Sequence, residues 1–185
     1  GCAFVRGVVD CSQQVAPEDP GVKAQVAAYR APVDRFANVV IGRAGMFFDG
    51  NREPGLRTQE MPLGNLIADV LRAAASKSDQ AVAAIFNSGS IRASINAGDV
   101  TFENALAGLP FGNTLAVVEL KGEELVAALD HGLSRPGEGA FPQVAGLKLV
   151  YCATVSCPAA LRSGGRVTAL TVNGVPVHST VGVRA

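Results

Sequence analysis

A short polar loop, residues 87–92 with the sequence NSGSIR, has residue types that could bind a polar or charged ligand. It directly follows residues 81–86, a continuous apolar run typical of a buried strand, and the ends of such strands are where ligands bind in α/β sheets. Asn87 supplies an amide, Arg92 supplies a planar cation, and the small residues let a ligand approach the backbone. The same residue types also make an ordinary turn, so the loop alone leaves both interpretations open.

Two further motifs carry residue types found in ligand sites. Residues 109–113, LPFGN, hold Phe111 between Pro and Gly, where an aromatic ring can offer its face to a base or a sugar. A plug for the hydrophobic core is the alternative. Residues 63–69, LGNLIAD, begin a predicted helix, where Gly64 either permits tight packing or leaves room for an anion at the helix N-terminus.

Residues for other hydrolase mechanisms are few. His131 and His178 are the only histidines, whereas a dinuclear metal centre needs several ligands converging on two ions. His131 falls near the end of a predicted helix, where a cation is favoured, and we interpret it as a helix-end residue. A serine nucleophile at Ser88 or Ser90 lacks the Gly-x-Ser-x-Gly elbow and an evident Asp–His partner. We therefore expect no metal site and no catalytic residue in this chain.

Composition favours a folded chain without a broad charged surface. The 185 residues are 48% hydrophobic and 17% charged, and the formal net charge is zero. No basic excess therefore indicates nucleic acid as the partner. No run of about 18 apolar residues is present that could span a membrane, and no signal peptide is evident. An anionic ligand would have to be met by a few placed arginines.

Four cysteines form two close pairs, one near each end of the sequence: Cys2 with Cys11, and Cys152 with Cys157. Two local disulfides would imply an oxidising compartment. A four-cysteine metal site is the alternative, although spacings of nine and five residues fit the usual metal knuckles poorly. We favour the two disulfides over a metal site or free thiols.

The hydrophobic pattern predicts alternating helices and strands. Helices are expected at residues 21–38, 65–75, 102–109 and 122–133, the first kinked or split at Pro32 and the third capped by Thr101. Strands are expected at residues 39–41, 81–86, 114–121, 147–152 and 166–172, the last turning into a hairpin at Asn173-Gly174. The sum is an α+β domain with a mixed β-sheet flanked by helices.

Taken in order, these motifs resemble the C-terminal domain of the 5'-nucleotidase family, which includes periplasmic UDP-sugar hydrolases and ecto-5'-nucleotidases. The similarity covers residues 51–178 and rests on Arg57 with LGNL (63–66), NxGxIR (87–92), GDVT (98–101), LPFGN (109–113), LKGEEL (120–125) and GAFPQxxG (139–146). It implies that residues 1–50 are a connecting segment and helix leaving an N-terminal domain. Residues 51–185 would be the nucleotide-binding domain, truncated at its end.

The resemblance also implies a division of labour between two domains. In such enzymes an N-terminal metallophosphoesterase domain holds two divalent metal ions, of the zinc or manganese type, and hydrolyses the ester. The C-terminal domain binds the nucleoside part, and a domain rotation brings the phosphate to the metals. This chain is therefore expected to bind a nucleotide or nucleoside, to have the metal domain as its partner, and to work outside the cytoplasm.

Six residues match the family's nucleotide pocket. Phe111 matches one of two aromatics that sandwich the base, and Asn113 is its polar neighbour. The other four are Arg57, Asn87 and Arg92, at polar positions, and Gly139, in a motif that lines the pocket. The family continues with a second aromatic and a Gly-Gly-Asp-Gly segment, so we expect only half of the base sandwich here. A 2',3'-cyclic-nucleotide phosphodiesterase, a UDP-sugar hydrolase and a secreted nucleotide-binding module without turnover stay open as alternatives.

Overall fold

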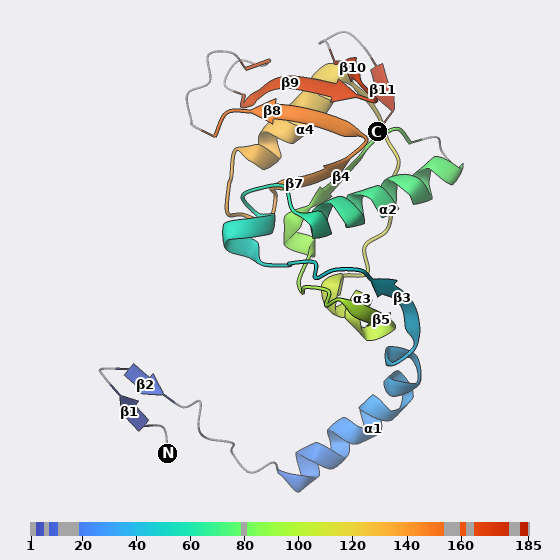
Figure 1. Cartoon of the computed structure of the whole chain (residues 1–185), viewed down its shortest axis with the longest axis vertical. Helices are drawn as coiled ribbons and strands as arrows, with labels where there is room; N and C mark the ends of the chain where they lie inside the picture. Colours follow the sequence, from blue (N-terminus) through green and yellow to red (C-terminus); the bar gives the residue numbers. More distant parts are fainter. Residues whose placement is uncertain are drawn as a thin grey trace. The chain divides into compact units, whose positions relative to one another are not determined.

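A computed structural model of the chain describes residues 3–5, 8–10, 19–78, 81–153, 160–161, 165–177 and 182–184 (Figure 1). Cys2, Cys11, Cys157 and His178 lie outside these ranges. The chain divides into two compact units, residues 1–39 and residues 40–185. The compact unit that holds the predicted site therefore begins at residue 40, while the domain boundary near residue 50 stays a prediction.

The first unit contains one helix and one pair of strands among its described residues. The strands β1 (Ala3–Val5) and β2 (Val8–Asp10) pair antiparallel. The helix α1 (Pro20–Ala37) begins at Asp19, whose Oδ1 accepts hydrogen bonds from the N–H groups of Gly21 and Val22 at 2.8 and 3.0 Å. The helix continues through Pro32 and is not split there, because proline removes one N–H from the ladder and the turns on both sides keep theirs.

The second unit combines helices with short sheets, which confirms the predicted α+β class (Figure 1). Every strand pairing among its described residues is antiparallel, and the strands form several small sheets. The expected single mixed sheet is therefore not seen in the described part of this unit. The pairs are β3 (Val40–Ala44) with β5 (Gly98–Thr101), β4 (Ala84–Asn87) with β7 (Pro142–Ala145), and β6 (Glu119–Lys121) with β11 (Gly182–Arg184). The strands β8 (Leu147–Tyr151), β9 (Val167–Val172) and β10 (Val175–Pro176) form a three-stranded sheet.

Helices cover these sheets. The helix α2 (Pro62–Ser78) packs against β4 and β7, and α4 (Gly122–Leu133) packs against β7 and β9 (Figure 1). The short helix α3 (Phe102–Gly108) follows β5, and Thr101 caps it as predicted, since its Oγ1 accepts from the N–H of Asn104 at 3.3 Å. None of the described helices combines the length and the apolar composition that a bilayer-spanning helix needs.

The larger core lies between α4 and the β8–β9 sheet. Leu125 and Leu129 of α4 and Val167 of β9 are fully buried there, with Phe141 beside them. Asp130 is buried at the edge of this core, where its Oδ1 accepts from the N–H groups of Arg166 and Val167 at 2.6 and 2.8 Å. These bonds fix the start of β9 against α4, because a charged acceptor makes the stronger kind of hydrogen bond.

A smaller core forms under the loop that carries Arg57. Leu56, Leu63 and Ile91 are fully buried in it. On α2, Leu63 and Ala68 therefore face inward, whereas Leu66 and Val70 are exposed.

The turn between β9 and β10 forms as its sequence predicts, whereas the strand expected at residues 114–121 forms only in part. The turn between β9 and β10 has Asn173 and Gly174 at positive φ, 49° and 79°, as the Asn-Gly pair predicts. Of the strand expected at residues 114–121, only β6 forms. Among the described residues, no strand pairs with residues 114–118, and a strand exists only where a neighbour completes its hydrogen bonds.

Candidate functional site

The loop that follows β4 is held by a second loop from a distant part of the sequence. β4 ends at Asn87, and the 3₁₀ turn η2 (Ser88–Ser90) follows at once. The N–H of Ser88 donates to the Phe141 carbonyl at 3.0 Å, and the N–H of Gly89 donates to the Gly139 carbonyl at 2.8 Å. A Cβ atom on Gly89 would lie 2.8 Å from Gly139 Cα, so the two loops can approach this closely only without side chains.

Hydrogen bonds link three polar side chains next to this contact, those of Asn87, Ser90 and Asn113. Asn87 Nδ2 donates to the Gly139 carbonyl at 3.4 Å. Ser90 Oγ donates to Asn87 Oδ1 at 3.0 Å, and Asn113 Nδ2 donates to Ser90 Oγ at 3.5 Å. The chain of hydrogen bonds thus brings together Asn87, Asn113 and Gly139, which the sequence separates widely. Ser90 was not among the expected site residues, although its loop was.

Phe111 stands beside this group with much of its ring accessible. Its exposed fraction is 48%, and the Arg92 guanidinium carbon lies 5.4 Å from the ring centroid, within the range of a cation–π contact. Arg92 is itself held, since its Nη1 donates to the Gly89 carbonyl at 3.2 Å. The core-plug alternative for Phe111 is therefore wrong. Among the described residues, no second aromatic ring stacks on it.

A cavity of about 460 Å³ opens at Phe111. Ser90, Phe111 and Asn113 contribute to its polar and aromatic part. Its apolar wall comes from α2, β4 and the segments on both sides of Phe111, and includes Leu71, Ile85, Phe86, Leu109 and Leu115. An aromatic face, an apolar wall and a few polar groups are the usual make-up of a small-molecule site.

Arg57 is hydrogen-bonded to the loop that contains Gly139. Its Nη1 donates to the Gly137 carbonyl at 3.4 Å, and the Gly137 N–H donates back to the Arg57 carbonyl at 2.9 Å. Gly137 lies two residues before Gly139, whose carbonyl holds the Asn87 loop. Arg57 therefore lies next to the loop that holds Gly139, but the hydrogen bonds described for it reach none of the other five expected site residues. Of the six, Phe111 and Asn113 line the cavity, and the roles of all six toward a ligand stay a prediction.

Gln143 fixes the loop that carries Arg57. This side chain is only 1% exposed, and its Nε2 donates to the carbonyls of Leu56 and Gln59 at 2.8 and 2.9 Å. Its Oε1 accepts from the Met61 N–H at 3.3 Å. Gly64 makes room for it, because a Cβ there would clash with the Gln143 side-chain amide. Gly64 therefore serves tight packing, one of the two interpretations of its motif.

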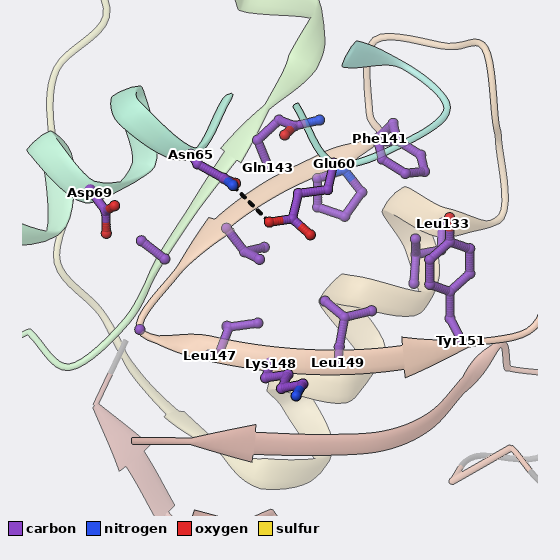
Figure 2. Close-up of a pocket in the computed structure, with 14 residues that line it drawn as sticks. Glu60, Asn65, Asp69, Leu133, Phe141, Gln143, Leu147, Lys148, Leu149 and Tyr151 are labelled. Atoms are coloured by element: carbon purple, nitrogen blue, oxygen red, sulfur yellow. Dashed lines mark hydrogen bonds between the residues drawn. The ribbon is translucent and has the colours of Figure 1, made fainter. Parts of the chain in front are cut away.

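A second cavity, of about 490 Å³, lies between the start of α2 and the β7–β8 segment (Figure 2). Figure 2 shows Asn65 donating to Glu60, at 2.7 Å between Nδ2 and Oε1, with Asp69 further along the same helix. None of the six expected site residues lines this cavity. Its charged lining residues are two carboxylates, Glu60 and Asp69, and one cation, Lys148, and this net negative charge disfavours a phosphate ester. We therefore place the candidate nucleotide site at Phe111.

Metal ligands and cysteines complete the account of the expected chemistry. Among the residues that the structure describes, no group of three or more His, Cys, Asp or Glu side chains is placed to hold a metal ion. The donor set in this part of the chain therefore does not fit a pair of divalent ions. His131 is exposed in the last turn of α4, as its helix-end interpretation predicts.

Cys152 is not a free thiol, but the two pairings stay predictions because the other three cysteines lie outside the described residues.

Comparison with known proteins agrees with this fold. Residues 39–181 match the family described as 5'-nucleotidase, C-terminal domain. The crystal structure of a 5'-nucleotidase precursor from Thermus thermophilus superposes with a TM-score of 0.78 at 37% identity, covering 91% of this chain and 33% of that one. The chain therefore belongs to the 5'-nucleotidase C-terminal domain family.

Curated relatives include much longer proteins. A trifunctional nucleotide phosphoesterase protein of Bacillus subtilis is 41% identical over 136 residues, which are 72% of this chain and 9% of that protein. The 5'-nucleotidase of Bos taurus is 38% identical over 146 residues, covering 73% of this chain and 25% of that protein. The chain thus spans a quarter or less of the length of these relatives.

Proposed function

We propose that this chain is the nucleotide-binding part of a 5'-nucleotidase-type hydrolase, in which a separate domain with two divalent metal ions removes the phosphate. The observation that carries the proposal is the linked group at the end of β4. It joins the 48% exposed ring of Phe111, the Arg92 cation against that ring and the Asn87–Ser90–Asn113 hydrogen bonds. Three members of the group, Ser90, Phe111 and Asn113, line one cavity. A nucleoside offers the matching chemistry, with a flat base and polar edges.

Phe111 provides the surface on which the base stacks. Stacking of a base on an aromatic ring contributes about 1–3 kcal/mol. Since Arg92 covers one face of the ring, the base takes the other face. A single stack with two or three hydrogen bonds gives roughly 4–5 kcal/mol, which corresponds to a dissociation constant near 1 mM.

Arg57 and Arg92 supply positive charge for ribose or phosphate oxygens. Their guanidinium groups offer donors in a fixed planar geometry. The formal net charge of the chain is zero, so this attraction is local and does not come from a broad basic field. We assign no catalytic step to this chain, because hydrolysis would use a nucleophile activated by the metals of the separate domain.

An extracytoplasmic location accompanies this function. Cys152 is not a free thiol, and we propose that it pairs with Cys157, and Cys2 with Cys11. Disulfides persist in oxidising compartments and are rare in the cytosol. A periplasmic, secreted or cell-surface protein would meet this condition.

Titration of the chain with adenosine or AMP, followed by NMR, tests the binding role. We expect chemical-shift changes centred on Phe111, Asn113 and the Asn87 loop, and their loss in Phe111→Ala. Phe102→Ala is the matched control, because Phe102 is 42% exposed on α3 and does not line the cavity at Phe111. Shifts that persist in Phe111→Ala would place the ligand elsewhere and overturn the proposed site.

Incubation of the same chain with AMP and added zinc or manganese tests the division of labour. We expect no release of phosphate above a protein-free control, because uncatalysed monoester hydrolysis has one of the largest known barriers. Metal-dependent turnover by the purified chain would show that it carries its own catalytic centre.

A further inference from the structure

An asparagine amide has a donor end and an acceptor end, and the end that faces a ligand decides which ligand groups it can bind. The hydrogen bonds at the end of β4 begin at the Gly139 carbonyl, which can only accept. Asn87 therefore turns its Nδ2 toward Gly139, at 3.4 Å, and its Oδ1 toward Ser90, at 3.0 Å. A backbone atom thus sets the orientation of the first amide.

Ser90 in turn sets the orientation of the Asn113 amide. Its hydroxyl has one proton, which is donated to Asn87 Oδ1, so the oxygen can only accept from Asn113. Asn113 accordingly turns its Nδ2 toward Ser90, at 3.5 Å. Ser90 is only 7% exposed, so water competes weakly for these bonds. Among the described residues, Asn113 Oδ1 accepts no hydrogen bond.

We infer that Ser90 is a positioning residue of the nucleotide site, which holds Asn113 with its Oδ1 as a hydrogen-bond acceptor beside Phe111. The inference rests on the proposed function. A base that presents an N–H donor, such as the exocyclic amino group of adenine, satisfies this acceptor. Purine riboside has the same ring system without the amino group and leaves the acceptor unpaired, although it stacks in the same way.

Paired NMR titrations with adenosine and purine riboside measure this selectivity. For the unmodified chain we expect adenosine to bind roughly three- to tenfold more tightly, the size of one hydrogen bond. In Ser90→Ala the Asn113 amide is free to turn over, and we expect the affinity ratio to fall close to one. Binding of purine riboside should change little, because Phe111 is untouched.

Ser88→Ala is the matched control. Ser88 is a buried serine of the same turn, and its Oγ donates to the Gly139 carbonyl at 3.5 Å without contacting Asn113. We expect this variant to keep the ratio of the unmodified chain. Equal affinity for the two nucleosides in the unmodified chain, or an unchanged ratio in Ser90→Ala, would overturn the inference while leaving nucleoside binding intact. Absence of binding by either nucleoside would instead count against the proposed function.

Discussion

Replacing Gln143 by glutamate is the sharpest test of how the Arg57 loop is held. The two side chains have the same shape, but glutamate has an oxygen where Gln143 has its Nε2. That oxygen would face the carbonyls of Leu56 and Gln59, which now accept from Nε2 at 2.8 and 2.9 Å. In Gln143→Glu the new carboxyl must therefore keep a proton or lose both hydrogen bonds.

The magnitude follows from these contacts. The protonated carboxyl can donate only one of the two bonds, which costs about 1 kcal/mol of the free energy of unfolding. Burial and two facing carbonyls raise the pKa of the new carboxyl in the folded state. Each unit of that rise corresponds to a further loss of about 1.4 kcal/mol once the pH exceeds the folded pKa.

The sign of the pH dependence is fixed by which state binds the proton. The folded variant keeps its proton, whereas the unfolded chain releases it above a pKa of about 4.3. The loss of stability relative to the unmodified chain is therefore smallest below about pH 4. It grows by about 1.4 kcal/mol per pH unit up to the raised pKa and then levels off.

Urea unfolding followed by circular dichroism between pH 4 and pH 7 measures this dependence. Gln59→Glu is the control, because Gln59 is an exposed residue of the same loop and the variant adds the same charge. We expect it to follow the unmodified chain within about 0.5 kcal/mol at every pH. If Gln143→Glu did the same, the hydrogen bonds described for Gln143 would be wrong.

Two further predictions concern the loop contact and the cysteines. In Gly89→Ala the added Cβ would lie 2.8 Å from Gly139 Cα, so the loops must separate. We expect a stability loss of about 1–3 kcal/mol and at least tenfold weaker nucleoside binding in the NMR titration. Gly112→Ala, where a Cβ meets nothing within 4 Å, should leave both unchanged, and equal behaviour of the two variants would refute the contact. For the cysteines, alkylation and mass spectrometry without reductant should find none of the four labelled, whereas alkylation after reduction should find all four labelled. Reduction should also lower the free energy of unfolding by about 2–3 kcal/mol per disulfide. Four labelled cysteines without reductant would remove both the pairings and the compartment inferred from them.

Elements with a strong local signal agree with the structure. The helix expected at residues 122–133 has these bounds in α4, because its apolar residues recur at helical spacing and face one core. The Thr101 cap and the Asn173-Gly174 turn also form as predicted, since a capping side chain and a residue at positive φ act within a few positions of the chain.

Elements that depend on a distant partner agree less well. Residues 114–118 alternate like a strand, yet among the described residues no partner pairs with them. The periodicity of residues 65–75 places Leu66 and Val70 on one apolar face, yet on α2 both are exposed while Ala68 is fully buried. The face of a helix that becomes buried depends on which sheet packs against it, and spacing alone does not encode that choice.

The sequence by itself determined the fold class, the helices with clear periodicity and the ordered motifs by which the chain resembles its family, because these are properties of residue type and short spacing. Only the tertiary structure decided that Gly139 meets Gly89, that Ser90 joins Asn87 to Asn113, that Arg92 covers one face of Phe111, and that Gln143 holds the Arg57 loop. These contacts join residues far apart in the sequence. They form because packing of the sheets and helices brings their loops within hydrogen-bonding distance, where buried polar groups must find partners.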